Sequence, residues 1–470
     1  MEKFFKVSEH GSTVKTEIIA GLTTFMAMAY ILMVNSGMFA ELETVSYGAI
    51  YIATGISAVI GTVLIGLLSN LPLAQASGMG LNAFFVYTVC FGLGFTYANA
   101  LLFVLADGLL FILLTVTGLR KLIFDAIPAP VKAAIPAGIG LFIAFLGFQD
   151  AKIVIASEST GVTLASFNLL GGASWADIMP LLVTIAAVIS MAVLSKKKVK
   201  GAILWSILGG AAVYYLLGLT IPDFYKGLFD GVSMNPLAAF GEFGELAFGK
   251  VFTEGFDFST YLAGEGHSVG GLVITFVTTA LAFCMVDMFD TMGTLYGACR
   301  SGNLLYKNEK GEDEVPNMNQ AMLADAIATC TGAICGTSTV TTFVESSSGV
   351  AVGGRTGLSS MVTALMFLIA LFLSPVAALI PACAYAAALV YVGVLMIGCV
   401  KDIDWSDPAS AIPSFLTITM MPFTYNISYG IAFGLISYVV IRLFTGEAKK
   451  VNAGTWIVSI LFLAMFFLTH

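Results

Sequence analysis

Apolar runs of roughly 20 residues recur along this chain, and they constrain its fold more than any other feature. A run of that length crosses the hydrocarbon core of a bilayer as one helix. We expect such spans at residues 17–36, 48–69, 96–117, 132–150, 177–195, 201–220, 270–291, 319–335, 358–380, 383–400, 409–423 and 427–444. Hydrophobic residues make up 58% of the 470 and charged residues only 11%, against about 25% charged in soluble domains. The sequence therefore predicts an all-α polytopic membrane protein.

Two further segments lie between apolar runs but lack the pattern of a plain helix. Residues 72–91 are polar at their start and punctuated by glycine. Residues 336–357 consist mainly of Thr, Ser and Gly around one acid, Glu345; the β-branched first half favours extended backbone, and the small second half fits a short helix. Irregular backbone at membrane depth must line a cavity or be buried in protein. We predict two broken segments, third and tenth in chain order; for 336–357 the alternative is a loop outside the bilayer.

Basic residues orient the spans, because Lys and Arg concentrate in cytoplasmic loops. With the N-terminus inside, one set of basic residues falls on one side: Arg120, Lys121, Lys196, Lys197, Lys198, Lys200, Arg300, Lys307, Lys310, Arg355, Lys401, Arg442, Lys449 and Lys450. The stretch 221–268 carries mostly acids and falls outside. This pattern predicts fourteen segments with both ends cytoplasmic, and it leaves open whether the short apolar segment 456–468 is a further span. The first twenty residues lack an apolar core, so we expect no cleavable signal peptide.

The two halves of the chain resemble each other. Residues 127–129 and 380–382 both read Ile-Pro-Ala, and small residues follow at the same offset of 253, including Gly140 and Gly393. Each half also has one broken segment as its third. Seven segments per half is an odd number, so the halves must insert with opposite topology. Paired broken segments in inverted repeats place a substrate site near the membrane midplane.

Residue usage argues against several functional classes. A net charge of −8 argues against a nucleic-acid partner. The seven cysteines are scattered and the three histidines do not cluster, so we expect no disulfide, no metal site and no enzymatic activity, and protons are the only cofactor-like species we expect. Residues 349–356 approach the phosphate-binding pattern G-x-x-x-x-G-K-[ST], but Arg355 replaces the lysine and a membrane helix follows. We therefore expect no nucleotide-binding loop.

Acids inside the spans are candidate functional groups, because a charge within a membrane is costly. Asp287 and Asp290 are three residues apart near the end of the span at 270–291, so they share one helix face. The alternative is that both reach the cytoplasmic surface. Glu345 is the third acid. For Asp107 and Asp325 we expect structural roles, such as bridges to Ser or Thr hydroxyl groups.

The ligand that these groups suit follows from their chemistry. No Lys or Arg lies in the middle of a span, so an anionic ligand would lack a counter-charge. Acids together with Asn82 and many hydroxyl groups suit a neutral ligand rich in N–H groups. Phe25, Tyr30, Phe84 and Phe343 can stack on a flat ring, although packing is the commoner role of any one Phe in a chain with 36.

Four motifs in combination resemble the nucleobase–cation symporters, and within them the azaguanine-type hypoxanthine–adenine–guanine permeases. They are GLTTFMAMAY at 21–30, GMGLNAFF at 78–85, DMFDTMGT at 287–294 and TSTVTTFVES at 337–346. The resemblance runs nearly end to end and implies the uracil-permease-like fold, with fourteen segments in a seven-plus-seven inverted repeat. Two positions depart from the family: Ser36 and Thr339 stand where proline is usual. We expect Thr339 to loosen the break in the tenth segment and to leave the site residues intact.

The resemblance also implies domains and site residues. The core domain would comprise 1–125 and 269–381 and the gate domain 126–220 and 382–446, with an extracellular loop at 221–268 and a tail at 447–470. Asn82 with Gly80, then Asp287 with Asp290 as the close alternative, and Glu345 would bind the substrate. The expected site is completed by Thr342, Phe343, Ser346 and Phe25. Glu345 and Asp287 would carry the coupled proton.

The function implied by the resemblance is proton-coupled uptake of adenine, guanine or hypoxanthine across the cell membrane. The core would move against the gate like an elevator, and the gate would form a homodimer. The partners would be a purine base and the lipid bilayer. Two alternatives stay open: a same-fold transporter of xanthine or uracil, and an anion exchanger or channel. The second needs a positive residue or an empty dipole pocket between the broken segments, and Asp287 and Glu345 argue against it.

Overall fold

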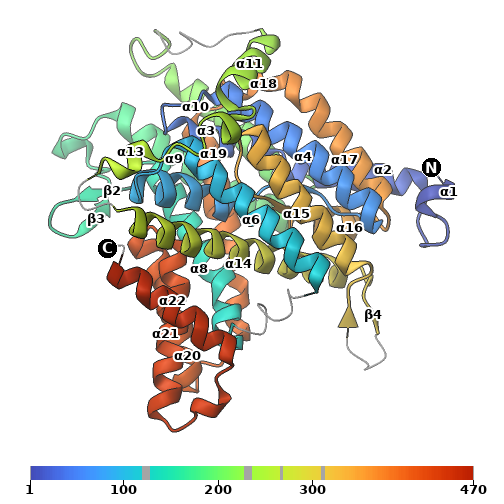
Figure 1. Cartoon of the computed structure of the whole chain (residues 1–470). Helices are drawn as coiled ribbons and strands as arrows, with labels where there is room; N and C mark the ends of the chain where they lie inside the picture. Colours follow the sequence, from blue (N-terminus) through green and yellow to red (C-terminus); the bar gives the residue numbers. More distant parts are fainter. Residues whose placement is uncertain (1, 119–126, 227–234, 265–267, 308–312, 469–470) are drawn as a thin grey trace.

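The computed structural model describes residues 2–118, 127–226, 235–264, 268–307 and 313–468, and within them it is a bundle of helices (Figure 1). Nine helices in these ranges are long and apolar enough to cross a membrane: Val14–Ala40, Tyr47–Ser69, Tyr97–Thr117, Ala129–Asp150, Trp175–Lys196, Val269–Ser301, Gly357–Ala377, Ala382–Asp402 and Ile427–Phe444. Arg120, Lys121, Lys310 and the expected domain boundary at 125/126 lie outside the described residues. The prediction of a helical polytopic membrane protein is confirmed.

The first half of the chain contains a series of long helices interrupted by one broken segment. Its elements are α1 (Glu2–Phe5), α2 (Val14–Met28), α3 (Tyr30–Ala40), α4 (Tyr47–Ser69), β1 (Gln75–Ser77), α5 (Met79–Ala83), the π-helix η1 (Phe84–Gly92), α6 (Tyr97–Thr117), α8 (Ala129–Asp150), β2 (Val154–Ser157), β3 (Gly161–Leu164), α9 (Trp175–Lys196) and α10 (Ala202–Gly218). Helices begin at N-cap side chains: the Ser46 hydroxyl accepts from Ala49 N, and Thr96 forms a capping box with Asn99. The α4 helix ends at Asn70 in the left-handed conformation.

The second half repeats the alternation of long helices with one broken segment. Its elements are α11 (Pro236–Glu242), η3 (Phe243–Ala247), α12 (Lys250–Thr253), α13 (Ser259–Leu262), α14 (Val269–Ser301), β4 (Tyr306–Lys307), β5 (Asp313–Glu314), α15 (Met318–Cys335), β6 (Val340–Thr342), α16 (Ser346–Val352), α17 (Gly357–Ala370), α18 (Ser374–Ala377), α19 (Ala382–Met396), η5 (Ile397–Asp402), α20 (Pro408–Thr424), α21 (Ile427–Phe444) and α22 (Ala453–Leu468). The stretch 221–268 is thus partly helical where it is described.

Three expected spans form helices that fall short of a full apolar span. The helices α10 and α20 have 17 residues each, and α15 has 18 but carries polar side chains that bind the broken segments. The opposite difference occurs at α14, which has 33 residues and continues ten residues beyond the expected end at 291. Asp287 and Asp290 therefore lie inside a helix instead of at its end. Asp287 is fully buried, so the alternative that both acids reach the cytoplasmic surface is wrong for Asp287.

The two broken segments lie side by side in the interior. The strands β1 and β6 pair antiparallel, with Gln75 opposite Thr342 and Ser77 opposite Val340. Both strands are fully buried. A short helix follows each strand, α5 in one segment and α16 in the other. The expected change from extended backbone to a short helix within 336–357 is present as β6 and α16, and the strand is buried inside the protein.

The helices that carry the Ile-Pro-Ala repeat pack against each other reciprocally. A Cβ on Gly140 of α8 would lie 2.9 Å from Gly393 O and 3.5 Å from Ile397 N, whereas a Cβ on Gly393 of α19 would lie 2.4 Å from Gly140 O and 3.3 Å from Ala144 N. Ala144 and Ile397 are themselves 253 residues apart. A contact in which each partner meets the counterpart of the other is what a local twofold relation produces.

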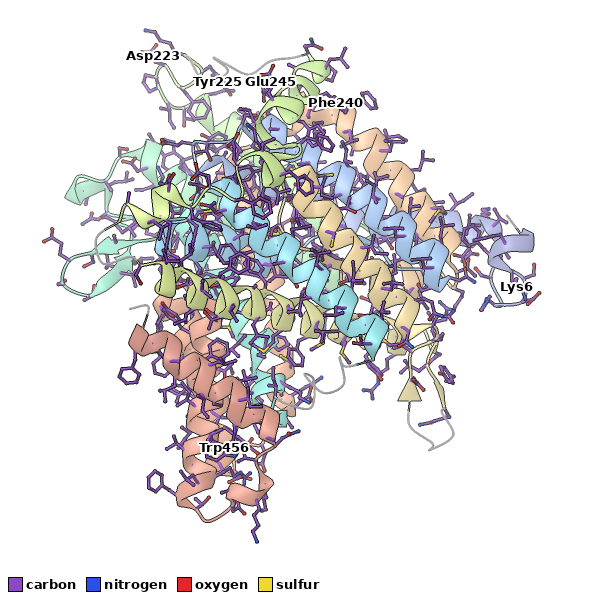
Figure 2. The ribbon with its side chains drawn as sticks, in the orientation of Figure 1. Lys6, Asp223, Tyr225, Phe240, Glu245 and Trp456 are labelled. Atoms are coloured by element: carbon purple, nitrogen blue, oxygen red, sulfur yellow. The ribbon has the colours of Figure 1, made fainter. Side chains whose placement is uncertain are left out.

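The remaining helices surround these central elements. The α4 helix packs against α15 and α17, α8 against α19 and α20, and α9 against α10. The tail helix α22, coloured red in Figure 1, packs against α21 and α14, and its Trp456 is labelled in Figure 2. The apolar tail is therefore an extra helix that lies against the bundle.

The N-terminal residues and the stretch after 221 contact opposite ends of α4. The Ser46 hydroxyl at the start of α4 donates to the Glu242 carboxylate, whereas the Asn70 amide at its end donates to Phe5 O over 3.2 Å. Figure 2 shows Lys6 at one end of the bundle and Glu245 near the other. Because α4 has 23 residues and is long enough to span a bilayer, these segments lie at opposite ends of a membrane-length helix.

Candidate functional site

The centre of the site is the pair of strands β1 and β6, which neighbouring helices hold through side-chain hydrogen bonds. Hydrogen bonds continue beyond the strand pairs, from Gly78 N to Thr339 O at 2.9 Å and from Phe343 N to Ala74 O at 3.0 Å. Backbone groups buried in a protein need such partners. The extended segments are therefore stable at this depth only as a pair, which explains why both occur in the chain.

Glu345 is the N-cap residue of α16, three residues after the end of β6, and it contacts the first span. Its Oε1 accepts a hydrogen bond from the Tyr30 hydroxyl at 2.7 Å, and its exposed fraction is 8%. Tyr30 begins α3, next to the break between α2 and α3 at Ala29. Asp290 on α14 is half-buried and close enough for its charge to interact with that of Glu345. The structure thus places the carboxyl groups of Glu345 and Asp290 near each other.

Asp287 lies on the same helix face but has different partners. It is fully buried, and its Oδ2 accepts from the Thr329 hydroxyl on α15 at 3.1 Å. Its Oδ1 has no hydrogen-bond partner among the described protein atoms. Asp287 interacts electrostatically with Asp107, Asp325 and Asp290. It therefore stands between the Glu345–Asp290 pair and a second group of acids deeper in the core.

Asn82 on α5 is fully buried and bound to its own segment. Its Oδ1 accepts from the Ser77 hydroxyl at 2.7 Å, and its Nδ2 donates to Ser77 O at 3.3 Å. The Ser77 hydroxyl also meets the Thr337 hydroxyl at 3.1 Å, which accepts from Asn35 Nδ2 at 2.9 Å. In this conformation the Asn82 amide makes one hydrogen bond through its oxygen and one through its nitrogen, which leaves one N–H group and one lone pair for another partner.

Asp325 and its neighbours hold the strands to the helices. Asp325 Oδ1 accepts from Gln75 Nε2 at 2.8 Å and from the Thr342 hydroxyl at 3.0 Å, and its Oδ2 accepts from the Thr291 hydroxyl at 2.7 Å. One carboxyl group therefore ties α15 to β1, β6 and α14. The prediction of bridges to hydroxyl groups is confirmed for Asp325.

Two predicted substrate ligands are already engaged with the protein. The Thr342 hydroxyl donates to Asp325, and the Ser346 hydroxyl accepts from Ala74 N at 3.0 Å. Gly80 has a packing reason to be glycine, because a Cβ there would lie 2.5 Å from Ile139 Cγ2 on α8. Phe25 is half-buried and packs edge-on against Phe367 with ring centroids 5.2 Å apart. Phe343 is buried between Thr342 and Glu345.

Sequence reasoning missed several residues of this network. Gln75, Thr291, Thr329 and Thr337 are fully buried and bind the acids or the asparagines, but they were not expected at the site. The available signal was weak: each is a polar residue inside or beside an apolar run, a pattern that many hydroxyl groups in this chain share. Hydroxyl groups in membrane helices commonly bond their own backbone, so this signal does not single out site residues.

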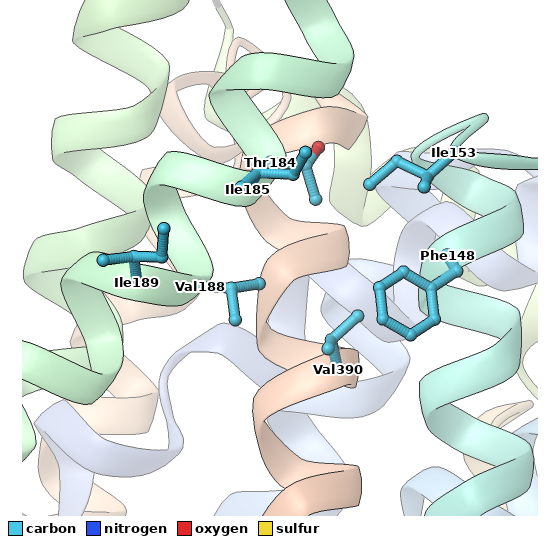
Figure 3. A pocket seen from close by; sticks show the side chains of 7 residues that line it. All are labelled: Phe148, Ile153, Thr184, Ile185, Val188, Ile189 and Val390. Carbon is cyan, nitrogen blue, oxygen red and sulfur yellow. The ribbon is translucent and has the colours of Figure 1, made fainter. Parts of the chain in front are cut away.

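A separate apolar hollow of about 150 Å³ lies between α8, α9 and α19 (Figure 3). Its lining residues are Phe148, Ile153, Thr184, Ile185, Val188, Ile189 and Val390. None of the predicted substrate ligands lines it. It has no charged group and is therefore unsuited to a ligand rich in N–H groups.

The charge of the site is uniformly acidic. Within the described ranges, the ion pairs involve none of Asp107, Asp287, Asp290, Asp325 and Glu345. No group of three or more His, Cys, Asp or Glu residues in the same ranges is arranged to hold a metal ion. The arrangement can accept hydrogen bonds and bind protons, and it offers no positive side chain to an anion.

The fold defines a helical polytopic membrane protein, and comparison with known proteins identifies its family. The sequence profile of the xanthine/uracil permeases, described as "Permease family", matches residues 15–433. The chain is 36% identical to the adenine permease AdeP of Escherichia coli, over 98% of this chain and 95% of that protein. It is 37% identical to the guanine/hypoxanthine permease PbuG of Bacillus subtilis, over 98% and 99%. The chain belongs to the xanthine/uracil permease family, in which these relatives are permeases and not enzymes.

The fold also occurs among solved transporter structures. The transmembrane domain of the cyanobacterial bicarbonate transporter BicA superposes with a TM-score of 0.57 at 17% identity, over 88% of this chain and 97% of that one. At this identity the similarity concerns the fold alone. It agrees with a helical, multi-pass membrane protein.

Proposed function

We propose that this protein is a secondary active transporter that takes up the purine bases adenine, guanine or hypoxanthine together with protons. The observation that supports it most is the pairing of two broken segments beside Glu345, Asn82 and the acids of α14. The names of the relatives support the purine class, because they are adenine and guanine/hypoxanthine permeases. Xanthine or uracil is the alternative substrate within the same fold.

The chemistry of a purine fits the groups at this site. A carboxylate can accept two N–H groups from one edge of the ring, and an amide such as Asn82 both donates and accepts. We assign Glu345 and Asp287 as the carboxyl ligands, with Asp290 as the alternative to Asp287. An anion exchanger is disfavoured because an anion would meet carboxyl groups and no cation in the described contacts of the site.

The proposed motion is an elevator in which a core domain slides against a gate domain. The core would comprise 1–125 and 269–381 and the gate 126–220 and 382–446. The reciprocal contact of Gly140 with Gly393 supports an inverted repeat, because equivalent residues of the two halves meet across it. The broken segments would move with the core, since Asp325 ties both strands to α15 and α14. A homodimer through the gate domain is part of the same proposal.

The proposed orientation places the N-terminus in the cytoplasm and residues 221–268 outside the cell. The contacts at the two ends of α4 support this assignment, because Phe5 and Glu242 meet opposite ends of that helix. The basic residues near the Phe5 end then follow the general bias toward the cytoplasm.

Purine uptake is the direct test of substrate class. In cells that lack their own purine uptake, expression is expected to cause accumulation of labelled hypoxanthine, guanine or adenine. A competition panel in reconstituted vesicles then ranks the three bases. Accumulation of uracil alone, or of no base, would refute the purine assignment.

Coupling is tested by separating the proton gradient from the sodium gradient. We expect an inward proton gradient to drive uptake, and a protonophore to abolish accumulation, because the site binds protons through its carboxyl groups. Replacing sodium by potassium on both sides is expected to leave uptake unchanged. Uptake that follows a sodium gradient while the pH is clamped would contradict proton coupling.

A further inference from the structure

Asp107 is a buried acid that the proposed transport cycle does not yet use. It lies in the middle of α6 and is fully buried. Its Oδ2 accepts from the Thr339 hydroxyl at 3.1 Å, and its Oδ1 has no hydrogen-bond partner among the described protein atoms. Thr339 is the residue that replaces the usual proline before β6, so this departure from the family provides the hydroxyl group that binds Asp107.

Asp287 on the adjacent helix α14 has a matching arrangement. One oxygen of each carboxyl group accepts from a threonine, Thr339 for Asp107 and Thr329 for Asp287, and the other oxygen of each is unpaired. The helices α6 and α14 pack together, and the charges of the two acids interact. Cys284 interacts electrostatically with both of them, which places both acids near the same stretch of α14.

Burial limits the charge that this pair can hold. A carboxylate without a counter-charge is very unfavourable in a low-dielectric interior, and two adjacent carboxylates are worse. A proton on one of the two carboxyl groups leaves a single negative charge between them, because a protonated carboxyl group is neutral. Other buried carboxyl pairs hold one proton between them for this reason.

Among the described residues that interact with Asp107, no basic group would replace this proton. The titratable groups that interact with it are Asp287 and Cys284 on α14 and Asp325 and Cys330 on α15. Two further elements, η1 and α12, pack on α6. Cys90 of η1 interacts with Tyr97 at the start of α6, and Lys250 of α12 is paired with Glu254.

We propose that Asp107 is a second proton-binding residue of the transporter and exchanges the coupled proton with Asp287. This inference rests on the proposed function. When a purine N–H group donates to Asp287, the ionised form of Asp287 is favoured. The proton then leaves Asp287 and binds to the carboxyl group of Asp107, so that Asp287 becomes the carboxylate and Asp107 the neutral acid. The total charge is unchanged, and the proton travels with the core while Asp287 binds the base.

The decisive variant is Asp107→Asn, which keeps the shape of the side chain and cannot bind the proton. We would reconstitute it in proteoliposomes that contain a pH-sensitive dye, and measure counterflow of labelled hypoxanthine and hypoxanthine-driven proton flux in the same preparation. The ratio of protons to hypoxanthine is expected to fall by about tenfold or more in this variant. Glu158→Gln, an exposed acid in the turn between β2 and β3, is the control for a neutralised carboxyl group.

The outcomes separate this inference from the proposed function. If the parent protein moves hypoxanthine without protons, proton coupling itself is refuted, and the inference falls with it. If the parent couples protons and Asp107→Asn keeps the parental ratio, Asp107 does not bind the coupled proton while the proposed function stands.

Two further variants test the inference if Asp107→Asn does not fold. Asp107→Glu keeps a carboxyl group and is expected to retain the parental ratio of protons to hypoxanthine. Thr339→Val removes the hydroxyl group that stabilises the Asp107 carboxylate, so Asp107 will hold its proton to higher pH. The pH of half-maximal uptake is therefore expected to move upward in Thr339→Val. An unchanged pH profile in Thr339→Val would contradict the inference.

Discussion

Glu345→Gln is expected to weaken purine binding by about ten- to a hundredfold. The change keeps the shape of the side chain and one acceptor, but it removes the negative charge and the titratable proton. A hydrogen bond to a charged group contributes about 1.5–3 kcal/mol, which gives the expected range. Asp287→Asn is expected to have the same or a larger effect, because its new amide donor would face a ring N–H group. The measurement is equilibrium binding of labelled hypoxanthine to each purified, folded variant.

The neighbouring acids serve as internal comparisons for this result. Asp290→Asn is expected to weaken binding less, if Asp290 only orients Glu345. Tyr30→Phe removes the hydroxyl group that donates to Glu345 Oε1. This variant is expected to lose about 1 kcal/mol of purine-binding free energy. Glu158→Gln neutralises an exposed acid far from the site and should bind like the parent. If both Glu345→Gln and Asp287→Asn bind normally while Asp290→Asn does not, the substrate ligands have been assigned to the wrong residues.

The fold was largely predictable because membrane helices are recognisable by the length of their apolar runs. The sequence located the spans and both broken segments, since Gly and β-branched residues between apolar runs disfavour a continuous helix and must be buried in protein at membrane depth. It misjudged the end of α14, because residues 292–301 include glycine and arginine and look like a loop, whereas the structure continues the helix to Ser301. It also treated 221–268 as a loop, although short helices form there that are too brief to have a clear period.

The site was predictable in its acids and not in their partners. A carboxyl group in an apolar span is conspicuous, so Asp287, Asp290 and Glu345 stood out. Their hydrogen-bond partners did not, because Tyr30 and Glu345 are separated by 315 residues and only the packing of the first span on α16 brings them together. Gln75 and Asp325 are a similar case, with a separation of 250 residues. Sequence periodicity reports which face of a helix is apolar, and it carries no information about which distant residue meets that face.

Gly393→Ala and Gly140→Ala are expected to destabilise the protein to similar extents, because each glycine meets the backbone of the other helix. The new Cβ would lie 2.4 Å from Gly140 O in the first variant and 2.9 Å from Gly393 O in the second, both closer than real Cβ contacts. Backbone cannot move aside as a flexible side chain can, so the helices α8 and α19 must separate. Such overpacking typically costs about 1–3 kcal/mol. The loss of stability is measured as a lower midpoint temperature of thermal unfolding in detergent, with size-exclusion chromatography used to monitor the unfolding.

The reciprocity of this contact makes the prediction sharper than a loss of stability alone. Once one substitution has pushed α8 and α19 apart, the second meets a contact that is already open, so the double variant should lose less than the sum of the two single variants. Gly209→Ala on α10 is the matched control, since a Cβ there has no neighbour within 4 Å and is expected to leave the midpoint unchanged or slightly raised. Two results would contradict this contact between α8 and α19. One is a double variant whose loss of stability equals the sum of the two single losses. The other is a destabilising Gly209→Ala together with harmless changes at Gly140 and Gly393.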